Sequence, residues 1–196
     1  ECFRPILPSP RYLKNDEVIA DSCGIPLIDH RHFLLDIRLP EEEIRERYPT
    51  LWAYIEEGKA KGLHERYLCR HRKPWYGQEN RVSAPIVCTY LGRGDAKCGR
   101  PFRFILNRSR ATVTNVYLAM YPQPELAAAF KRSPDLILRV WKTLNSITPE
   151  RMLGEGRVYG GGLHKLEPKE LGNVPLPELA DLLSDPRGIS RQPSFF

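Results

Sequence analysis

The stretch Pro101-Phe-Arg-Phe-Ile-Leu106 decides the fold, because it has the two-residue period of a strand in a half-buried sheet. Phe102, Phe104 and Leu106 fall on one face of this strand, and Arg103 falls on the other. We therefore predict a strand with its aromatic face in the core.

Further apolar segments on both sides of this stretch alternate with amphipathic ones. Residues 1–26 are dotted with prolines and have little periodicity, so we expect a linker or wrapping segment there. The mixed order predicts an α+β fold in which a small mixed β-sheet is flanked by helices. Strands are expected at 32–39, 84–91, 116–121 and within 158–163, a turn at 92–94, and helices at 40–48, from 51 to Gly58 or Gly62, and at 63–70, 124–132, 135–146, 167–171 and 178–183.

Composition is that of a water-soluble globular protein, with 41% hydrophobic and 28% charged residues. No apolar run approaches the roughly 20 residues of a membrane span, and no signal peptide opens the chain. The five cysteines have neither zinc-site nor disulfide spacing, which favours a reducing, cytoplasmic compartment. The chain starts at Glu1, and we expect it to be a piece of a longer protein.

Positive charge is concentrated in residues 64–110. This segment has eleven Lys and Arg against three Asp and Glu, a net +8, whereas the whole chain is +6. Such a segment is typical of a nucleic-acid-binding surface, although a solvated basic face is the alternative.

The richest part of this segment is 66–76. Its cations could neutralise successive phosphates, and its two adjacent aromatic residues could stack on bases or wedge into a base step. Alternatively, the aromatic residues anchor a loop onto the core. The candidate residues are Arg66, Arg70, Arg72, Lys73, Trp75 and Tyr76.

A second candidate group lies on and after the 101–106 strand. Arginine pairs well with guanine edges and asparagine with adenine edges, so a polar loop leaving a strand could read bases. Alternatively, the asparagines cap turns. The candidates are Arg103, Asn107, Arg108 and Asn115 for bases, and Arg110 for phosphate.

A third candidate is the glycine-rich run at 160–162, followed by His164 and Lys165. Glycines allow close backbone approach, so His164 and Lys165 could contact phosphate, although a plain turn is equally consistent with the glycines.

Catalytic patterns are weak. His30 and His32 lack further metal ligands, and Asp36, Glu57 and Lys59 only faintly resemble the acidic pair and lysine of a metal-dependent nuclease. A protein-interaction module is another alternative, with partner-anchoring tryptophans at positions 52, 75 and 141.

Several motifs together resemble the C-terminal target-recognition region of gamma-class adenine-N6 DNA methyltransferases of restriction–modification systems. They are Arg72-Lys-Pro-Trp-Tyr, Phe102-Arg-Phe-Ile-Leu-Asn107, Asn115-Val-Tyr-Leu118 and Gly160-Gly-Gly-Leu-His-Lys-Leu-Glu-Pro-Lys-Glu-Leu171, and the resemblance spans residues 63–177.

This resemblance implies a division of the chain into three parts. Residues 1–62 would join a preceding catalytic domain, 63–177 would form the DNA target-recognition core, and 178–196 would be a C-terminal helix and tail. The bacterial parent enzyme would use S-adenosylmethionine. No Pro-Pro dipeptide and no strand–GxG–helix unit occurs in this chain, so we expect it to hold neither catalytic residues, cofactor nor metal by itself. The implied partners are double-stranded DNA and the chain's own catalytic domain, with no membrane.

Overall fold

The computed structural model describes residues 2–93 and 100–184, and it confirms the α+β class. A four-stranded sheet organises the larger lobe, with strand order β2 (Glu17–Val18), β6 (Phe104–Asn107), β4 (Ile86–Thr89) and β7 (Tyr117–Met120). β4 pairs antiparallel with β6 and with β7, and β2 pairs parallel with β6. The strands expected within 84–91, 101–106 and 116–121 are therefore present, and they are neighbours.

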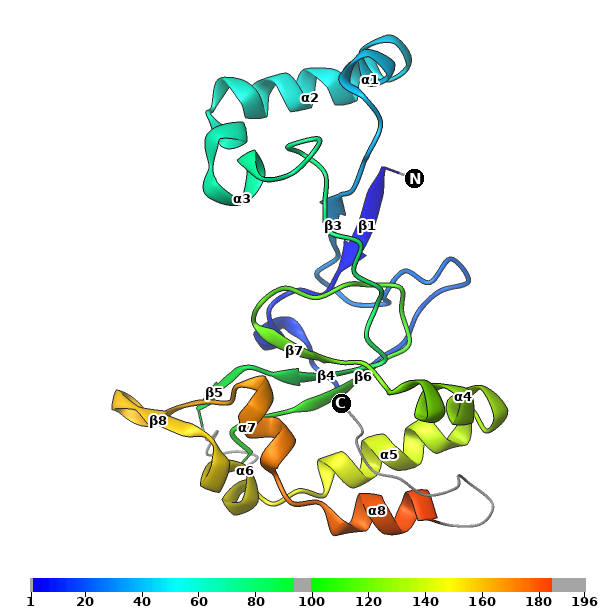
Figure 1. Cartoon of the computed structure of the whole chain (residues 1–196), viewed down its shortest axis with the longest axis vertical. Helices are drawn as coiled ribbons and strands as arrows, with labels where there is room; N and C mark the ends of the chain where they lie inside the picture. Colours follow the sequence, from blue (N-terminus) through cyan, green and yellow to red (C-terminus); the bar gives the residue numbers. More distant parts are fainter. Residues whose placement is uncertain (1, 94–99, 185–196) are drawn as a thin grey trace.

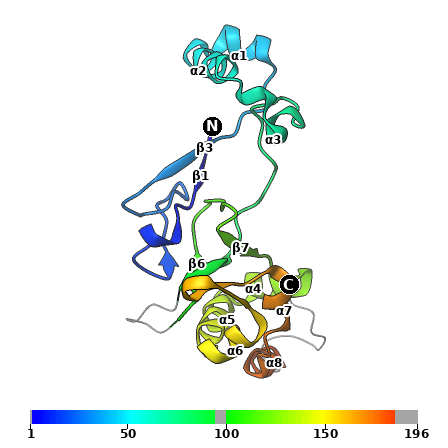
Figure 2. The ribbon, with the colours of Figure 1, turned by 90° about the vertical axis from the view of Figure 1, so that its left-hand side faces the viewer.

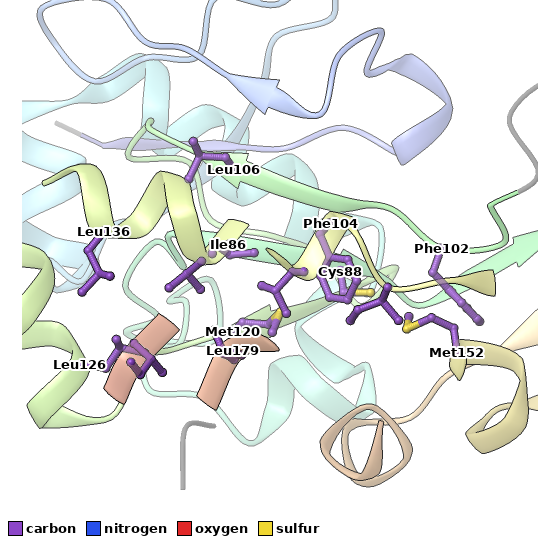
Figure 3. Close-up of a cluster of buried hydrophobic side chains, with 14 of the residues drawn as sticks. Ile86, Cys88, Phe102, Phe104, Leu106, Met120, Leu126, Leu136, Met152 and Leu179 are labelled. Atoms are coloured by element: carbon purple, nitrogen blue, oxygen red, sulfur yellow. The ribbon is translucent and has the colours of Figure 1, made fainter. Parts of the chain in front are cut away.

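Side chains alternate across this sheet, and both of its faces are buried. Phe104 and Leu106 lie on the face that packs against the C-terminal helices, as the two-residue period predicted, and Ile105 lies on the other face. Figure 3 shows the larger of the two resulting clusters. The cluster contains Ile86, Cys88, Phe102, Phe104, Leu106, Met120, Leu126, Leu136, Val140, Leu144, Met152, Leu179 and other buried residues.

Five helices follow the sheet in sequence and cover that face (Figure 1). Four of the five begin with proline in the first turn, where its missing N–H leaves no intrahelical bond unmade. The helices predicted at 124–132, 135–146, 167–171 and 178–183 are confirmed to within two residues, and a helix at 149–155 was not predicted. They are α4 (Pro124–Arg132), α5 (Asp135–Asn145), α6 (Pro149–Glu155), α7 (Pro168–Asn173) and α8 (Pro177–Ser184).

The N-terminal segment is part of the fold. β1 (Phe3–Ile6) pairs antiparallel with β3 (His32–Leu35), and a 3-10 turn, η1 (Pro10–Tyr12), separates β1 from β2. Leu7, Leu13 and Val18 are buried against Val87 and Ile105 on the second face of the sheet. Residues 2–30 thus supply the cover that this face needs, where the sequence indicated a linker or wrapping segment.

A small helical lobe is inserted between β3 and β4. It contains α1 (Glu41–Arg47), α2 (Pro49–Ala60), the 3-10 turn η2 (Leu63–Glu65) and α3 (Tyr67–Arg70). Figures 1 and 2 both show it at one end of the elongated molecule, joined to the sheet lobe through β1, β3 and the chain that descends to β4. Its separate core contains Ile37, Ile44, Ile55 and Tyr76.

A three-stranded antiparallel sheet lies beside β4, with strand order β5 (Leu91–Arg93), β9 (Leu163–Lys165) and β8 (Arg157–Tyr159). The prediction of a turn at 92–94 is wrong for Gly92 and Arg93, because both residues belong to β5. Gly94 lies outside the described residues. The 3-10 turn η3 (Gly160–Gly162) joins β8 to β9, and Gly161 and Gly162 have φ of 74° and 70°, which favour glycine.

The residues around the expected boundary between 62 and 63 pack together in the structure, so the packing does not follow that boundary. Leu63–Arg70 belong with α1 and α2 in the helical lobe, whereas residues 2–30 pack on the sheet with the segments after residue 84. The helix expected at the start of the C-terminal part, α8, packs against α5.

Candidate nucleic-acid interface

The two aromatic residues of the 66–76 motif belong to the core of the helical lobe. Tyr76 is buried and donates its hydroxyl to the carbonyl of Leu39 at 2.7 Å. Burial, with a smaller contribution from Glu41, raises the pKa of this hydroxyl. Trp75 packs edge-on against Tyr76, with 5.7 Å between ring centroids. The structure therefore favours the anchoring alternative for both residues.

Gly58 on α2 makes room for Trp75. A Cβ at position 58 would lie 3.1 Å from Cη2 of the Trp75 ring, so the absence of a side chain lets the indole approach the helix. This contact fixes the path of the loop after α3, and it leaves the motif's cations outside the core.

The cations of the same motif remain at the surface. Arg66, Arg70 and Lys73 are exposed, and Arg72 is half-buried with its guanidinium donating to Oε1 of Gln78 at 3.0 Å. None of these four forms an ion pair with any residue that the structure describes. Their charges are therefore uncompensated.

The neighbouring helices of the same lobe show the opposite arrangement. Arg47 pairs with Glu43 at 2.6 Å on α1, and on α2 Lys61 pairs with Glu57 while Lys59 lies 3.9 Å from Glu56. Three of the cations on and just after these helices thus lie near carboxylates, and Arg45 stacks on Trp52, whereas the described cations from Arg66 to Lys73 have no such carboxylate.

Arg103 is tied into the fold. Its Nε donates to Asp16 at 2.6 Å, and its terminal nitrogens donate to three carbonyls of the N-terminal segment. These acceptors belong to Pro10, Leu13 and Asn15. The guanidinium holds the N-terminal segment on the sheet, and its donors are occupied there.

Asn107 is also occupied within the chain. It is 6% exposed, and its amide donates to the carbonyls of Ala84 and Ala111 at 3.1 and 3.0 Å. Its Oδ1 accepts from the backbone and the hydroxyl of Ser109. Asn107 thus shapes the loop after β6, in line with the turn-capping alternative.

Other members of this group are accessible. Arg108 is exposed and pairs with Glu17 at 2.6 Å, and Asn115 is also exposed. Arg110 is exposed and forms no ion pair with a described residue. It lines an open groove of about 480 Å³ together with Arg4, Arg81, Asn80 and Ser83.

His164 and Lys165 lie on β9 and are half-buried. Lys165 pairs with Glu167 at 2.8 Å and lies 5.1 Å from the centroid of the Tyr90 ring. Hydrogen bonds to Glu167 and then to Tyr90 raise the pKa of Lys165. Both of these contacts hold Lys165 against the protein.

The sequence did not single out Tyr67, which the structure makes the most exposed tyrosine near the free cations, at 69%. The available signal was its i, i+3 and i, i+4 spacing to Arg70 and His71 on a short helix. In the structure both residues do contact its ring.

The residues of the nuclease alternative are engaged elsewhere. Asp36 pairs with Arg4 beside β1 and β3, and Glu57 pairs with Lys61. Within residues 2–93 and 100–184, no three His, Cys, Asp or Glu side chains gather as a metal site would require. In the same ranges no helix has the length and apolar character needed to cross a bilayer.

The architecture is that of an α+β domain that carries a helical insertion with an uncompensated cationic segment. Residues 27–191 match the family described as type II methyltransferase M.Eco57I, C-terminal domain. The chain therefore belongs to this family of type II methyltransferase C-terminal domains, and the resemblance found in the sequence is confirmed.

Two relatives are similar over much of the chain. It is 33% identical to the type II methyltransferase M.XamI of Xanthomonas campestris pv. amaranthicola over 138 residues, which cover 70% of this chain and 23% of that protein. It is 28% identical to the type II methyltransferase M.AccI of Acinetobacter calcoaceticus over 119 residues, which cover 61% of this chain and 20% of that protein. The chain thus spans less than a quarter of the length of either relative. No solved structure matches it.

Proposed function

We propose that this chain is the DNA target-recognition part of a site-specific adenine-N6 methyltransferase in the bacterial cytoplasm. In this proposal it binds duplex DNA and positions the target adenine, and the catalytic domain of the same enzyme transfers a methyl group from S-adenosylmethionine. Membership of the type II methyltransferase family supports the parent activity.

The observation that carries the DNA-binding role is the set of unpaired cations from α3 to Lys73. Arg66, Arg70 and Lys73 are exposed with no carboxylate partner among the residues described, whereas Arg47, Lys59 and Lys61 lie near carboxylates of α1 and α2. A phosphate backbone is the polyanion that such a surface attracts, because each neutralised phosphate releases condensed counterions.

The side-chain contacts favour fewer DNA-contacting residues than the sequence predicted, divided between phosphate contact and base reading. We assign phosphate contact to the five Lys and Arg candidates that form no ion pair within the part of the chain that the structure describes. We assign base reading to Arg108 and Asn115, because both are exposed on the loop between β6 and β7, and a surface pair such as Arg108–Glu17 exchanges readily. We leave Arg103, Asn107 and Tyr76 out of the interface, because their polar groups are satisfied inside the chain. The phosphate set is Arg66, Arg70, Arg72, Lys73 and Arg110.

The remaining steps fall to the catalytic domain. Extruding an adenine from the stack costs a few kcal/mol, which contacts made by both domains must offset. The cofactor S-adenosylmethionine and the methyl-transfer residues are assigned to that domain. His164 and Lys165 stay as candidate phosphate contacts, and Lys165 would first have to leave Glu167 and Tyr90.

The test compares two triple variants of the helical lobe for binding to a fluorescein-labelled duplex at low salt. The variant Arg66→Ala, Arg70→Ala, Lys73→Ala should bind at least about tenfold more weakly than wild type. The control variant Arg47→Ala, Lys59→Ala, Lys61→Ala removes the same charge from ion-paired positions and should bind nearly as well as wild type. Equal losses in the two variants would argue against a dedicated surface, and no binding by wild type would refute the proposal.

A further inference from the structure

Two large apolar side chains stand exposed on α3. Tyr67 is 69% exposed and the next residue, Leu68, is 65% exposed. Single exposed apolar residues are common, but two consecutive ones on a four-residue helix form a small apolar projection.

The ring of Tyr67 is held in position by its neighbours on the same helix. The guanidinium carbon of Arg70 lies 5.3 Å from the ring centroid, and the His71 ring lies 4.7 Å from it at an interplanar angle of 51°. His71 Nδ1 also lies 2.6 Å from the carbonyl oxygen of Tyr67, which ties the imidazole to the same turn. A side chain held in this way loses less conformational entropy when it contacts a partner.

Cations without an ion pair among residues 2–93 and 100–184 flank this projection in the sequence. Arg66 precedes it, and Arg70 and Lys73 follow it within six residues of Tyr67. An apolar side chain between phosphate-binding cations is the arrangement by which proteins insert a wedge into a DNA groove. A purely apolar partner would leave these charges without counterions, so the charges favour DNA as the occupant.

We propose that Tyr67 and Leu68 form an apolar wedge that contacts the bases of the duplex held by the neighbouring cations. This inference rests on the proposed DNA-binding function. The sequence assigns the aromatic contact to Trp75 and Tyr76, but those rings pack in the core of the helical lobe. Tyr67 takes over that contact because it is the aromatic side chain that the cationic segment leaves exposed.

The wedge makes a neutral contact, which separates it experimentally from the cations. Removing a base contact lowers affinity at every salt concentration by the same factor, whereas removing a phosphate contact also changes the slope of log affinity against log salt by about 0.9. Stacking contacts correspond to losses of about 5- to 100-fold in affinity per aromatic residue.

The experiment measures duplex binding by the 196-residue chain across a salt series for four variants. They are Tyr67→Ala, Tyr67→Phe, Leu68→Ala and the control Tyr54→Ala, which removes a tyrosine of the same lobe that is 62% exposed on α2. Thermal melts of each variant verify folding.

Tyr67→Ala should bind about 5- to 100-fold more weakly, and Leu68→Ala should also bind more weakly, both with an unchanged salt slope. Tyr67→Phe and Tyr54→Ala should bind like wild type. Wild-type affinity in Tyr67→Ala and Leu68→Ala would overturn the wedge, and so would a slope reduced by about one, because the loss would then act through Arg70. If the wild-type chain itself fails to bind, the proposed function fails instead.

Discussion

Arg103 donates its Nε–H to the carboxylate of Asp16 at 2.6 Å, joining the residue just before β6 to a residue 87 positions earlier in the chain. The same guanidinium donates to the carbonyls of Pro10, Leu13 and Asn15. One side chain thereby donates to three carbonyls of the N-terminal segment, of which that of Pro10 also accepts from the backbone N–H of Leu13. The N-terminal cover of the sheet depends on this arginine.

Replacing Arg103 should therefore destabilise the fold. Arg103→Met keeps the apolar stem but removes the donor to Asp16 and to the carbonyls of Leu13 and Asn15, and we expect the free energy of unfolding to fall by about 2–3 kcal/mol. Urea denaturation followed by tryptophan fluorescence measures this loss. Arg108→Met, which breaks the exposed pair with Glu17, is the matched control and should cost only about 0–1 kcal/mol. Equal costs for the two variants would contradict the anchoring role.

Asn107 should also act on stability. Asn107→Ala removes the donor to two backbone carbonyls and the acceptor for Ser109 in a buried loop, at an expected cost of about 2–3 kcal/mol. Hydrogen exchange should show faster opening of residues 107–112 than in wild type. If Asn107→Ala instead kept wild-type stability and bound DNA more weakly, the structural role would be contradicted and Asn107 would be assigned to the DNA interface.

The buried hydroxyl of Tyr76 predicts that the stability of the helical lobe depends on pH. Its folded pKa is raised, so the unfolded chain binds fewer protons than the folded chain once the pH exceeds about 10, and stability must fall as the pH rises through that range. Tyr76→Phe loses the hydrogen bond to Leu39, which costs about 1 kcal/mol at neutral pH.

Because phenylalanine does not titrate, the stability gap between wild type and Tyr76→Phe should narrow between about pH 9 and pH 11. Denaturant melts of both proteins at several pH values measure this gap. A gap that stays constant would contradict the buried, neutral hydroxyl.

The sequence predicted the central sheet well, because its signal is local. Alternation in 101–106 placed Phe104 and Leu106 on the core face, and apolar runs marked β4 and β7. Helices α4, α5 and α8 followed from their periodicity and start signals. Each of these features depends on neighbours within a few residues.

What the sequence missed depends on long-range packing. The segment 2–30 has no regular period, so the burial of Leu7, Leu13 and Val18 follows only from the sheet face that they cover. Arg103 is held in the fold and kept out of a DNA contact by Asp16, which is distant in sequence.

The aromatic residues show the same limit. Trp75 and Tyr76 look like surface stacking residues beside four cations in the sequence. In the structure Trp75 packs into the space left by Gly58, and Tyr76 donates to the carbonyl of Leu39, so both belong to the core of the helical lobe. The neighbouring Tyr67 stays outside because α3 ends after one turn and presents it to solvent.

The salt dependence of duplex binding tests the central claim most directly. With five unpaired cations on phosphates, log affinity against log salt should have a slope of about −4 to −5 for the wild-type chain. Removing Arg66, Arg70 and Lys73 together should reduce it to about −2, while the ion-paired control triple keeps the wild-type slope. A slope near zero for the wild type, or the same slope in both triple variants, would contradict the account.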